Sequence, residues 1–204
     1  MRNSVLDDPR LYSFLCVVDL EFATAARAAG CPHCGGDLHS ARYPRSIHGI
    51  GAGTDATDRY RASFCCAQDG CRRRVTPPSV RFLGRKRFLS AVVLLVSAAR
   101  HGARPVVAHA LQSAYGVSRS TLGRWQRWWR ESVPKTAFWS MAKARLMPPV
   151  DRARVAAELV QRFDATVAIE NLIRVLRFIA PLHHDARTLV DSQGYRGSHG
   201  ARRV

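Results

Sequence analysis

Two close pairs of cysteines in the first half of this chain constrain its fold more than any other feature. The first pair is Cys31 and Cys34, and the second pair is Cys66 and Cys71. Because each pair can hold one side of a tetrahedral ion, the two pairs together have the spacing of a structural site with four thiolate ligands. We therefore predict one Zn²⁺ ion bound by these four cysteines.

The third ligand can be either of two adjacent cysteines. Cys65 and Cys66 can each partner Cys71. The segment 60–66 has the composition of a β-strand, in which alternate residues share a face. Cys66 then lies on the same face as Phe64, and this favours Cys66 as the ligand.

Three other side chains are weaker ligand candidates. His33 lies inside the first pair, where its ring is expected to point away from the ion, and His39 lies five residues beyond Cys34. Cys16 is far from the other cysteines in sequence and lies on the apolar face of a predicted helix, so we expect it to pack in the core.

The residues around the cysteine pairs predict a small β-structure. Segments 38–43 and 60–66 have the composition of the two strands of a hairpin, and the Gly-rich run 49–53 is predicted to form its tip. Two glycines follow Cys34 directly, and such small residues let backbone N–H groups turn towards a thiolate sulfur. This combination is typical of the knuckle of a zinc ribbon.

The chain is strongly basic, with a formal net charge of +17 and a pI near 11.0. Nearly all of the positive charge is arginine, because Lys86, Lys135 and Lys143 are the only lysines. Such a charge favours a polyanionic partner, since each phosphate that is neutralised releases condensed counterions. Double-stranded DNA is the predicted partner.

The same sequence does not predict a membrane protein. Its longest strongly apolar run, residues 91–99, is about half of the ~20 residues that are needed to span a bilayer. The N-terminal segment carries several acidic residues and no small-residue cleavage pattern of a secretory signal. We expect a cytoplasmic, nucleoid-associated protein, in a reducing compartment where cysteine pairs are more often metal ligands than disulfides.

Apolar periodicity predicts helices on both sides of the cysteine pairs. They are expected at 8–29, 85–101, 105–114, 118–131 and, as one longer helical stretch, 151–180. The predicted fold class is α+β, mostly α. The predicted organisation is an N-terminal helical arm (1–30), a zinc ribbon (31–78), a helix-turn-helix domain (79–135), a C-terminal helical segment (136–192) and a disordered basic tail (193–204).

A second motif joins two of these predicted helices. Gly116 can supply a left-handed turn residue, and the Ser118 hydroxyl can cap the helix that follows. Apolar residues lie where two helices must interlock, at Leu111, Tyr115, Val117, Leu122 and Trp125. This stretch, residues 111–125, resembles the helix-turn-helix of bacterial regulators and of transposase or recombinase DNA-binding domains.

The resemblance implies that residues 118–130 form a recognition helix. Its first turn is then expected to present Arg119, Ser120 and Thr121 to base edges, with Arg124 one turn further along. Arg127 and Arg130 are expected to contact phosphates.

Two further groups of residues have a role to be assigned. Arg72, Arg73 and Arg74 follow the last cysteine of the second pair and form a basic edge that can lie along a nucleic-acid backbone. Trp125, Trp128 and Trp129 could stack on nucleobases, but their helical spacing favours core packing.

A zinc ribbon followed by a helix-turn-helix, over residues 31–135, resembles the DNA-binding front end of insertion-sequence transposases and of small proteins encoded beside them. The resemblance implies DNA binding and a transposase as a candidate partner. Transposases of the acidic-triad type need carboxylates that converge on paired divalent ions. The acids after Arg130 are spread over predicted helices without alternating strands, so we predict a non-catalytic protein.

Two alternatives remain open beside this interpretation. One is a truncated or remnant transposase, and the other is an RNA- or protein-binding adaptor that uses a zinc ribbon for docking. The long apolar helices expected after Asp151 are also candidates for pairing two chains into a homodimer.

Overall fold

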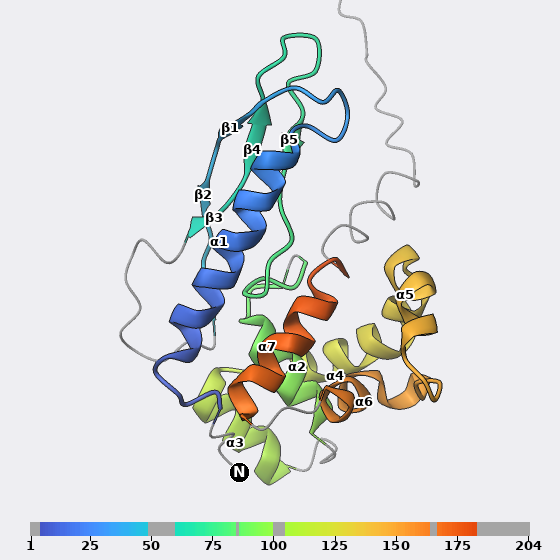
Figure 1. Ribbon diagram of the computed structural model, residues 1–204. Coiled ribbons are helices and arrows are strands. Elements are labelled where there is room, and N and C mark those ends of the chain that lie inside the picture. The colour runs from blue at the N-terminus through green and yellow to red at the C-terminus, as the bar shows by residue number, and fades with distance from the viewer. Residues whose placement is uncertain (1–4, 49–59, 85, 100–104, 164–166, 183–204) are drawn as a thin grey trace, which may run out of the picture.

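The computed structural model describes residues 5–48, 60–84, 86–99, 105–163 and 167–182. The molecule has a narrow end built of short strands and a broader end built of helices, and one long helix runs alongside the strands (Figure 1). The Gly-rich run 49–53 and the basic tail 193–204 lie outside the described residues, so the predictions for them stay predictions.

Helices predominate among the described elements, as predicted for an α+β chain that is mostly α. The helices are α1 (Leu11–Ala29), α2 (Ser90–Ala98), α3 (Pro105–Tyr115), α4 (Arg119–Arg127), α5 (Ala137–Ala142), α6 (Val155–Arg162) and α7 (Ala168–Ile179). The strands are β1 (Leu38–Ser40), β2 (Tyr43–Pro44), β3 (Tyr60–Arg61), β4 (Phe64–Cys66) and β5 (Arg74–Val75).

The strands form two small antiparallel sheets. One has the order β1-β4-β5, with Leu38 opposite Cys66 and Phe64 opposite Val75, and the other pairs β2 with β3. The predicted pairing of segments 38–43 and 60–66 is therefore found, divided into two short ladders. The sequence did not predict β5. We call residues 31–48 and 60–76 the cysteine unit.

The predicted helix 85–101 is shorter than expected, because α2 begins only at Ser90. The two residues before it are extended instead: Phe88 forms a bridge with His48, and Leu89 forms a bridge with Phe82. Backbone hydrogen bonds from Leu89 to His48 and from His48 to Arg87 complete this arrangement. Contacts distant in sequence thus override the local helical preference.

Helices α2 to α7 surround one apolar core and form what we call the helical unit. Its centre is α2, which is buried nearly all round, and α6 packs along it. Described residues of both predicted segments, 79–135 and 136–192, contribute to this core. The apolar residues of α6 and α7 that suggested a dimer surface are buried inside the chain, at Val155, Leu159, Leu172, Val175, Leu176 and Ile179.

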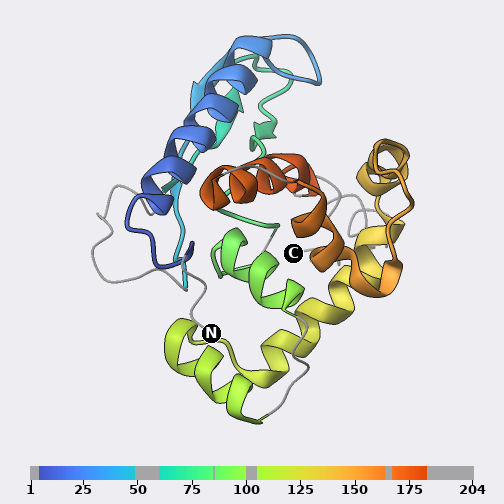
Figure 2. The same ribbon diagram turned by 60° about the horizontal axis from the view of Figure 1, so that its bottom comes forward.

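Helix α1 belongs to both units. Leu11, Leu15 and Val18 pack in the helical core, whereas Ala23, one turn further on, packs with Leu38 of the cysteine unit. The first part of α1 thus packs against the helical unit and its last part against the cysteine unit. In both views α1 runs from the helical body towards the end built of strands (Figures 1 and 2).

A buried ion pair reinforces this connection. Asp19 of α1 accepts hydrogen bonds from Ser79 Oγ (2.6 Å), the Val80 backbone N–H (2.7 Å) and Arg81 Nε (2.8 Å). Arg81 also donates to the Tyr60 carbonyl oxygen (3.1 Å) in the cysteine unit. Both charged side chains are 8% exposed, so the pair is largely removed from water.

None of the helices in the described part of the chain combines the length and the apolar character that a membrane crossing requires.

Candidate metal centre and nucleic-acid interface

The two cysteine pairs come together at the narrow end of the molecule. The sulfur atoms of Cys31, Cys34, Cys66 and Cys71 all lie within 4.8 Å of one another. Cys31 Sγ is 3.7 Å from Cys71 Sγ, and Cys34 Sγ is 3.4 Å from Cys66 Sγ. A tetrahedron with metal–sulfur bonds of about 2.3 Å has sulfur–sulfur edges of about 3.8 Å, whereas a disulfide requires about 2.05 Å. The arrangement is that of a possible metal site and not of two disulfides.

Two backbone turns of similar design hold the four sulfurs. In the first turn, the N–H of Cys31 donates to the Gly36 carbonyl oxygen, and the N–H of Gly35 donates to the Cys31 carbonyl oxygen, both at 2.8 Å. In the second turn, the N–H of Cys66 donates to the Arg73 carbonyl oxygen at 2.9 Å. The residue after the second cysteine of each pair is left-handed, with φ of 72° at Gly35 and 43° at Arg72.

The protein environment shifts the pKa values of the Cys31 and Cys66 thiols in opposite directions. The backbone N–H of His33 points at the Cys31 sulfur and lowers the pKa of that thiol to about 7. Burial raises the pKa of the Cys66 thiol to about 12, although the backbone N–H of Gln68 acts in the opposite direction. Cys31 and Cys66 are buried, Cys71 is partly buried and Cys34 is exposed. Negative charge on several sulfurs this close together is favoured when a cation offsets it, and a bound divalent ion would supply that offset.

The remaining ligand candidates lie outside the cluster. Cys65 faces the other side of β4, where its Sγ lies 3.6 Å from the Arg72 carbonyl oxygen. His33 Nδ1 lies 3.1 Å from a guanidinium nitrogen of Arg73. Cys16 is partly buried on α1, with its Sγ 3.4 Å from Arg81. Of the adjacent cysteines, the structure therefore brings Cys66 and not Cys65 to the cluster.

The second motif is found as two helices, α3 and α4, joined by a tight turn. Gly116 has a φ of 68°, and its N–H donates to the Gln112 carbonyl oxygen at 2.9 Å. The N–H of Val117 donates to the Leu111 carbonyl oxygen at 3.3 Å. These two bonds satisfy the last carbonyls of α3. Ser118 then caps α4 by accepting from the Thr121 N–H at 3.2 Å.

Helix α4 and its continuation have one buried face and one exposed basic face. Leu122, Trp125 and Trp129 are buried in the core. Four arginines are exposed on the other side, at Arg119, Arg124, Arg127 and Arg130. Ser120 is also exposed, and its hydroxyl lies 3.0 Å from Ser118 Oγ.

Thr121 requires a correction. The sequence suggested that it faces base edges together with Arg119 and Ser120, but it is only 9% exposed. Its hydroxyl accepts from Arg124 at 3.0 Å and lies 2.9 Å from Ser118 Oγ. Its role in the structure is to organise the helix start and to position the Arg124 side chain.

The tryptophans of this segment pack as core residues, as predicted. Trp128 is partly buried, and its ring lies under the Lys86 ammonium, which is 3.3 Å from the ring centroid. Burial lowers the pKa of Lys86 to about 7, while the face of an indole favours the charged ammonium. The helical turn from Trp128 to Ser132 is a π-helix, so the register of Trp129 and Arg130 differs from that of a continuous α-helix.

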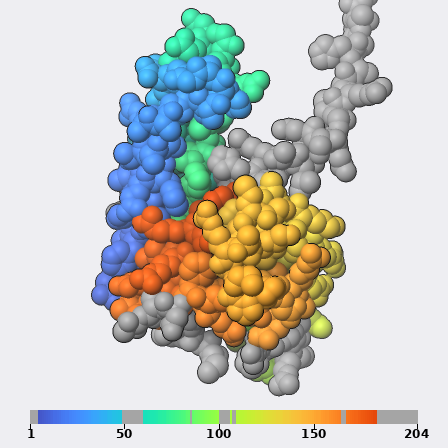
Figure 3. Space-filling view, turned by 45° about the vertical axis from the view of Figure 1, so that its right-hand side comes forward, coloured from blue at the N-terminus to red at the C-terminus, as the bar shows by residue number. Residues whose placement is uncertain are grey.

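The two basic regions predicted from the sequence do not form one continuous surface. Arg72, Arg73 and Arg74 are all exposed, beside the cysteines at the narrow end. The α4 arginines belong to the helical body, well away from that end in both views (Figures 1 and 2). In space-filling view the cysteine unit projects from the broader helical body (Figure 3). Arg72 is also paired with Asp69, so Arg73 and Arg74 carry the free charge of this edge.

The sequence analysis did not identify the buried ion pair of Asp19 and Arg81, which connects the units. Asp19 lies among the apolar residues of α1, and an acid on a buried face indicates that it has a charged partner. Its partner Arg81, sixty-two residues further on, has no local signal at all.

Comparisons of the chain with protein-family models, with curated proteins and with solved structures give no match.

Proposed function

We propose that this chain is a non-catalytic, zinc-containing DNA-binding protein that reads duplex DNA with α4 and its continuation, residues 118–130. The observation that carries the proposal is the exposed row of four arginines on a helix whose opposite face is anchored in the core. Such a helix presents charge on a rigid support, and its width fits a major groove.

The geometry of the row suggests a division of roles. Arg119 lies at the start of α4, and Arg124 is held by its hydrogen bond to Thr121. These two arginines are placed to reach base edges, where a guanidinium can make paired hydrogen bonds to guanine. Arg127 and Arg130 follow towards the end of the helix and are assigned to phosphates, which fix the register without reading sequence.

Zinc is the proposed ion because the four donors are all sulfur and their spacing matches a tetrahedral site. With four thiolate ligands no coordination position is open to substrate, so the ion has a structural role. Arg73 and Arg74 lie beside it and provide a second phosphate contact, remote from the α4 face. The association with a transposon, the transposase partner and the nucleoid location rest on the sequence motifs alone.

Three of the acids that follow Arg130 have local partners. Asp151 caps a turn through the Ala153 N–H at 2.9 Å, Glu158 pairs with Arg162 at 3.0 Å, and Glu131 lies 3.7 Å from Arg130. Within the described ranges, the four cysteines are the only group of three or more metal-binding side chains that come together.

The test is a set of single alanine variants, measured against a selected duplex and a scrambled one. Arg119→Ala and Arg124→Ala should each weaken binding to the selected duplex by about 5- to 150-fold, equal to ~1–3 kcal/mol, and should relax specificity at one base pair. Arg127→Ala should weaken both duplexes alike. Equal losses for all three variants on both duplexes would mean that the helix supplies only charge.

Salt dependence provides a second measurement on the unmodified protein. If about 6 to 10 phosphates are engaged, affinity should fall by roughly a thousandfold or more between about 50 and 200 mM salt. A flat response would contradict the DNA-binding proposal as a whole.

A further inference from the structure

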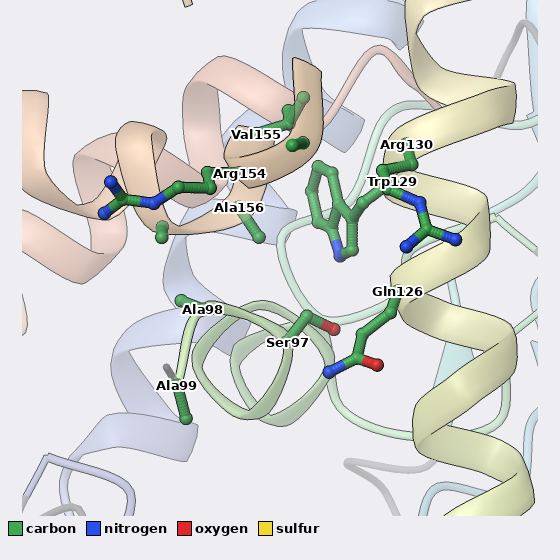
Figure 4. Close-up of a pocket in the computed structure, with 11 residues that line it drawn as sticks. Ser97, Ala98, Ala99, Gln126, Trp129, Arg130, Arg154, Val155 and Ala156 are labelled. Atoms are coloured by element: carbon green, nitrogen blue, oxygen red, sulfur yellow. The ribbon is translucent and has the colours of Figure 1, made fainter. Parts of the chain in front are cut away.

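A cavity of about 550 Å³ lies in the helical unit, between the end of α2, the π-helical turn that follows α4, and the start of α6 (Figure 4). Its volume is within the range of small-molecule sites, about 300 to 1,000 Å³. The proposed DNA contacts of Arg119, Arg124 and Arg127 do not involve it, whereas Arg130 lies at its rim. It is remote from the cysteine cluster.

Two buried polar atoms in the cavity wall lack a hydrogen-bond partner among the described residues. They are the indole Nε1 of Trp129, a residue that is only 3% exposed, and the hydroxyl of Ser97. In Figure 4 both point into the same space, which the Gln126 amide also faces. Buried donors are nearly always paired in folded proteins, so an unpaired indole N–H beside a cavity indicates a ligand that accepts from it.

The backbone at this wall is unusual in the same place. The π-helical turn Trp128–Ser132 contains both Trp129 and Arg130. Such turns are rare, and they occur frequently at functional sites because they redirect side chains out of the α-helical register. Here Trp129 forms a wall of the cavity while Arg130, the next residue, stands at its rim (Figure 4).

The lining defines the chemistry of the ligand. Arg130 and Arg154 bring two positive charges to the cavity, and no described lining residue is acidic. Arg130 also forms an exposed ion pair with Glu131 at 3.7 Å. The rest of the wall consists mainly of small apolar side chains, at Ala98, Ala99, Ala153, Val155, Ala156 and Ala157. Charged groups that are all positive, together with an aromatic wall, suit a flat molecule that carries negative charge.

We propose that this cavity binds a small planar anion, a ring that carries a phosphate or a carboxylate group. The ring lies against the small side chains and the Trp129 indole and accepts from Trp129 and Ser97. The anionic group pairs with Arg154, whose guanidinium points to the opposite end of the cavity from Arg130 (Figure 4). The site does not depend on DNA binding, and its test uses no DNA.

The test is calorimetry on the full-length, metal-loaded chain with two probes, adenosine monophosphate for the phosphate source and salicylate for the carboxylate source. We expect one-to-one binding of one of them. Arg154→Ala should lower that affinity by about 10- to 100-fold, since it removes a charge-assisted hydrogen bond. Arg152 is the matched control, because it is exposed on the same short turn but does not line the cavity, and Arg152→Ala should change the affinity less than about twofold.

Two further variants test the unpaired donors. Trp129→Phe keeps the aromatic wall and removes only the N–H, and Ser97→Ala removes only the hydroxyl. Each should lower affinity by about fivefold and leave the thermal midpoint unchanged or raised, because a donor without a partner contributes nothing to folding. No binding of either probe at millimolar concentration, or equal losses for Arg152→Ala and Arg154→Ala, would overturn the proposal.

Discussion

The cysteine unit and the helical unit are held together by one helix but depend on different sources of stability. The apolar core of the cysteine unit consists of four of its own residues, Cys31, Leu38, Phe64 and Cys66, together with Ala23 of α1, and its strands are two or three residues long. The helical unit instead buries a continuous core around α2. A unit this small cannot offset its conformational entropy by apolar burial alone. The proposed ion would replace the missing core in the cysteine unit, and the helical unit does not need one.

Removal of the metal is the strongest way to break this comparison. Ligation by four thiolates contributes on the order of 10 kcal/mol to a small zinc domain. A chelator should therefore unfold the cysteine unit and leave α2 to α7 protected, as measured by amide hydrogen exchange on peptides from each unit. Equal loss of protection in both units would show that the helical core depends on the ion as well.

Adjacent cysteines provide a matched pair of variants for the same question. Cys66→Ser removes a fully buried sulfur of the cluster and should reduce the zinc content to well below one ion per chain. Cys65→Ser changes the neighbouring residue, whose sulfur lies outside the cluster, and should keep one ion per chain. Zinc measured in freshly purified, reduced protein distinguishes these outcomes, and the reverse result would move the ligand to Cys65.

The features that could be predicted from the sequence are those that depend on residues only a few positions apart. The two cysteine pairs, Gly116 and Ser118 each act within a few residues, so their geometry followed from local chemistry. Strand β5, at Arg74–Val75, is only two residues long and exists because it pairs with β4. No local pattern marks such a strand.

The same limit explains the errors at the candidate sites. Thr121 looked like a contact residue because it is polar and close to the helix start, but the cap formed with Ser118 turns it inward. The cavity beside Trp129 is assembled from α2, the π-helical turn and α6, three segments distant in sequence. Whether its polar atoms have hydrogen-bond partners depends on how these segments pack together, which the sequence does not show.

The buried pair between Asp19 and Arg81 tests whether the two units are coupled. Asp19→Ala leaves the Arg81 guanidinium buried without its charge partner, which should lower the free energy of unfolding by about 3–5 kcal/mol. Glu21→Ala is the control, because Glu21 is an exposed acid on the same helix that pairs with Arg177, and its effect should stay below about 1 kcal/mol. Urea unfolding followed by circular dichroism measures both. Similar effects for the two variants would mean that the buried pair does not couple the units.

A core substitution in the helical unit tests whether its stability is independent of the cysteine unit. Leu159 of α6 is fully buried, and Leu159→Ala should lower the free energy of unfolding by about 2–5 kcal/mol. Val106→Ala, at a position that is 81% exposed on α3, should change it by no more than about 0.5 kcal/mol. Because we propose that an ion and not the helical core stabilises the cysteine unit, the zinc content should stay at one ion per chain in both variants. Loss of zinc in Leu159→Ala would contradict this independence.

The smallest expected effects come from one identical substitution made in each unit. Gly35 and Gly116 are both left-handed, with φ of 72° and 68°, and a Cβ at either position would meet no atom within 4 Å. The change to alanine therefore costs only the backbone preference, about 1–2 kcal/mol in each case. In Gly35→Ala this should appear as a zinc affinity lowered by about 5- to 30-fold, measured by competition with a chelating indicator, with an unchanged thermal midpoint of the helices. In Gly116→Ala the midpoint should fall and the zinc affinity should stay the same. If both variants lowered both quantities, the two units would share one stability, and the contrast between an ion and a core would have to be abandoned.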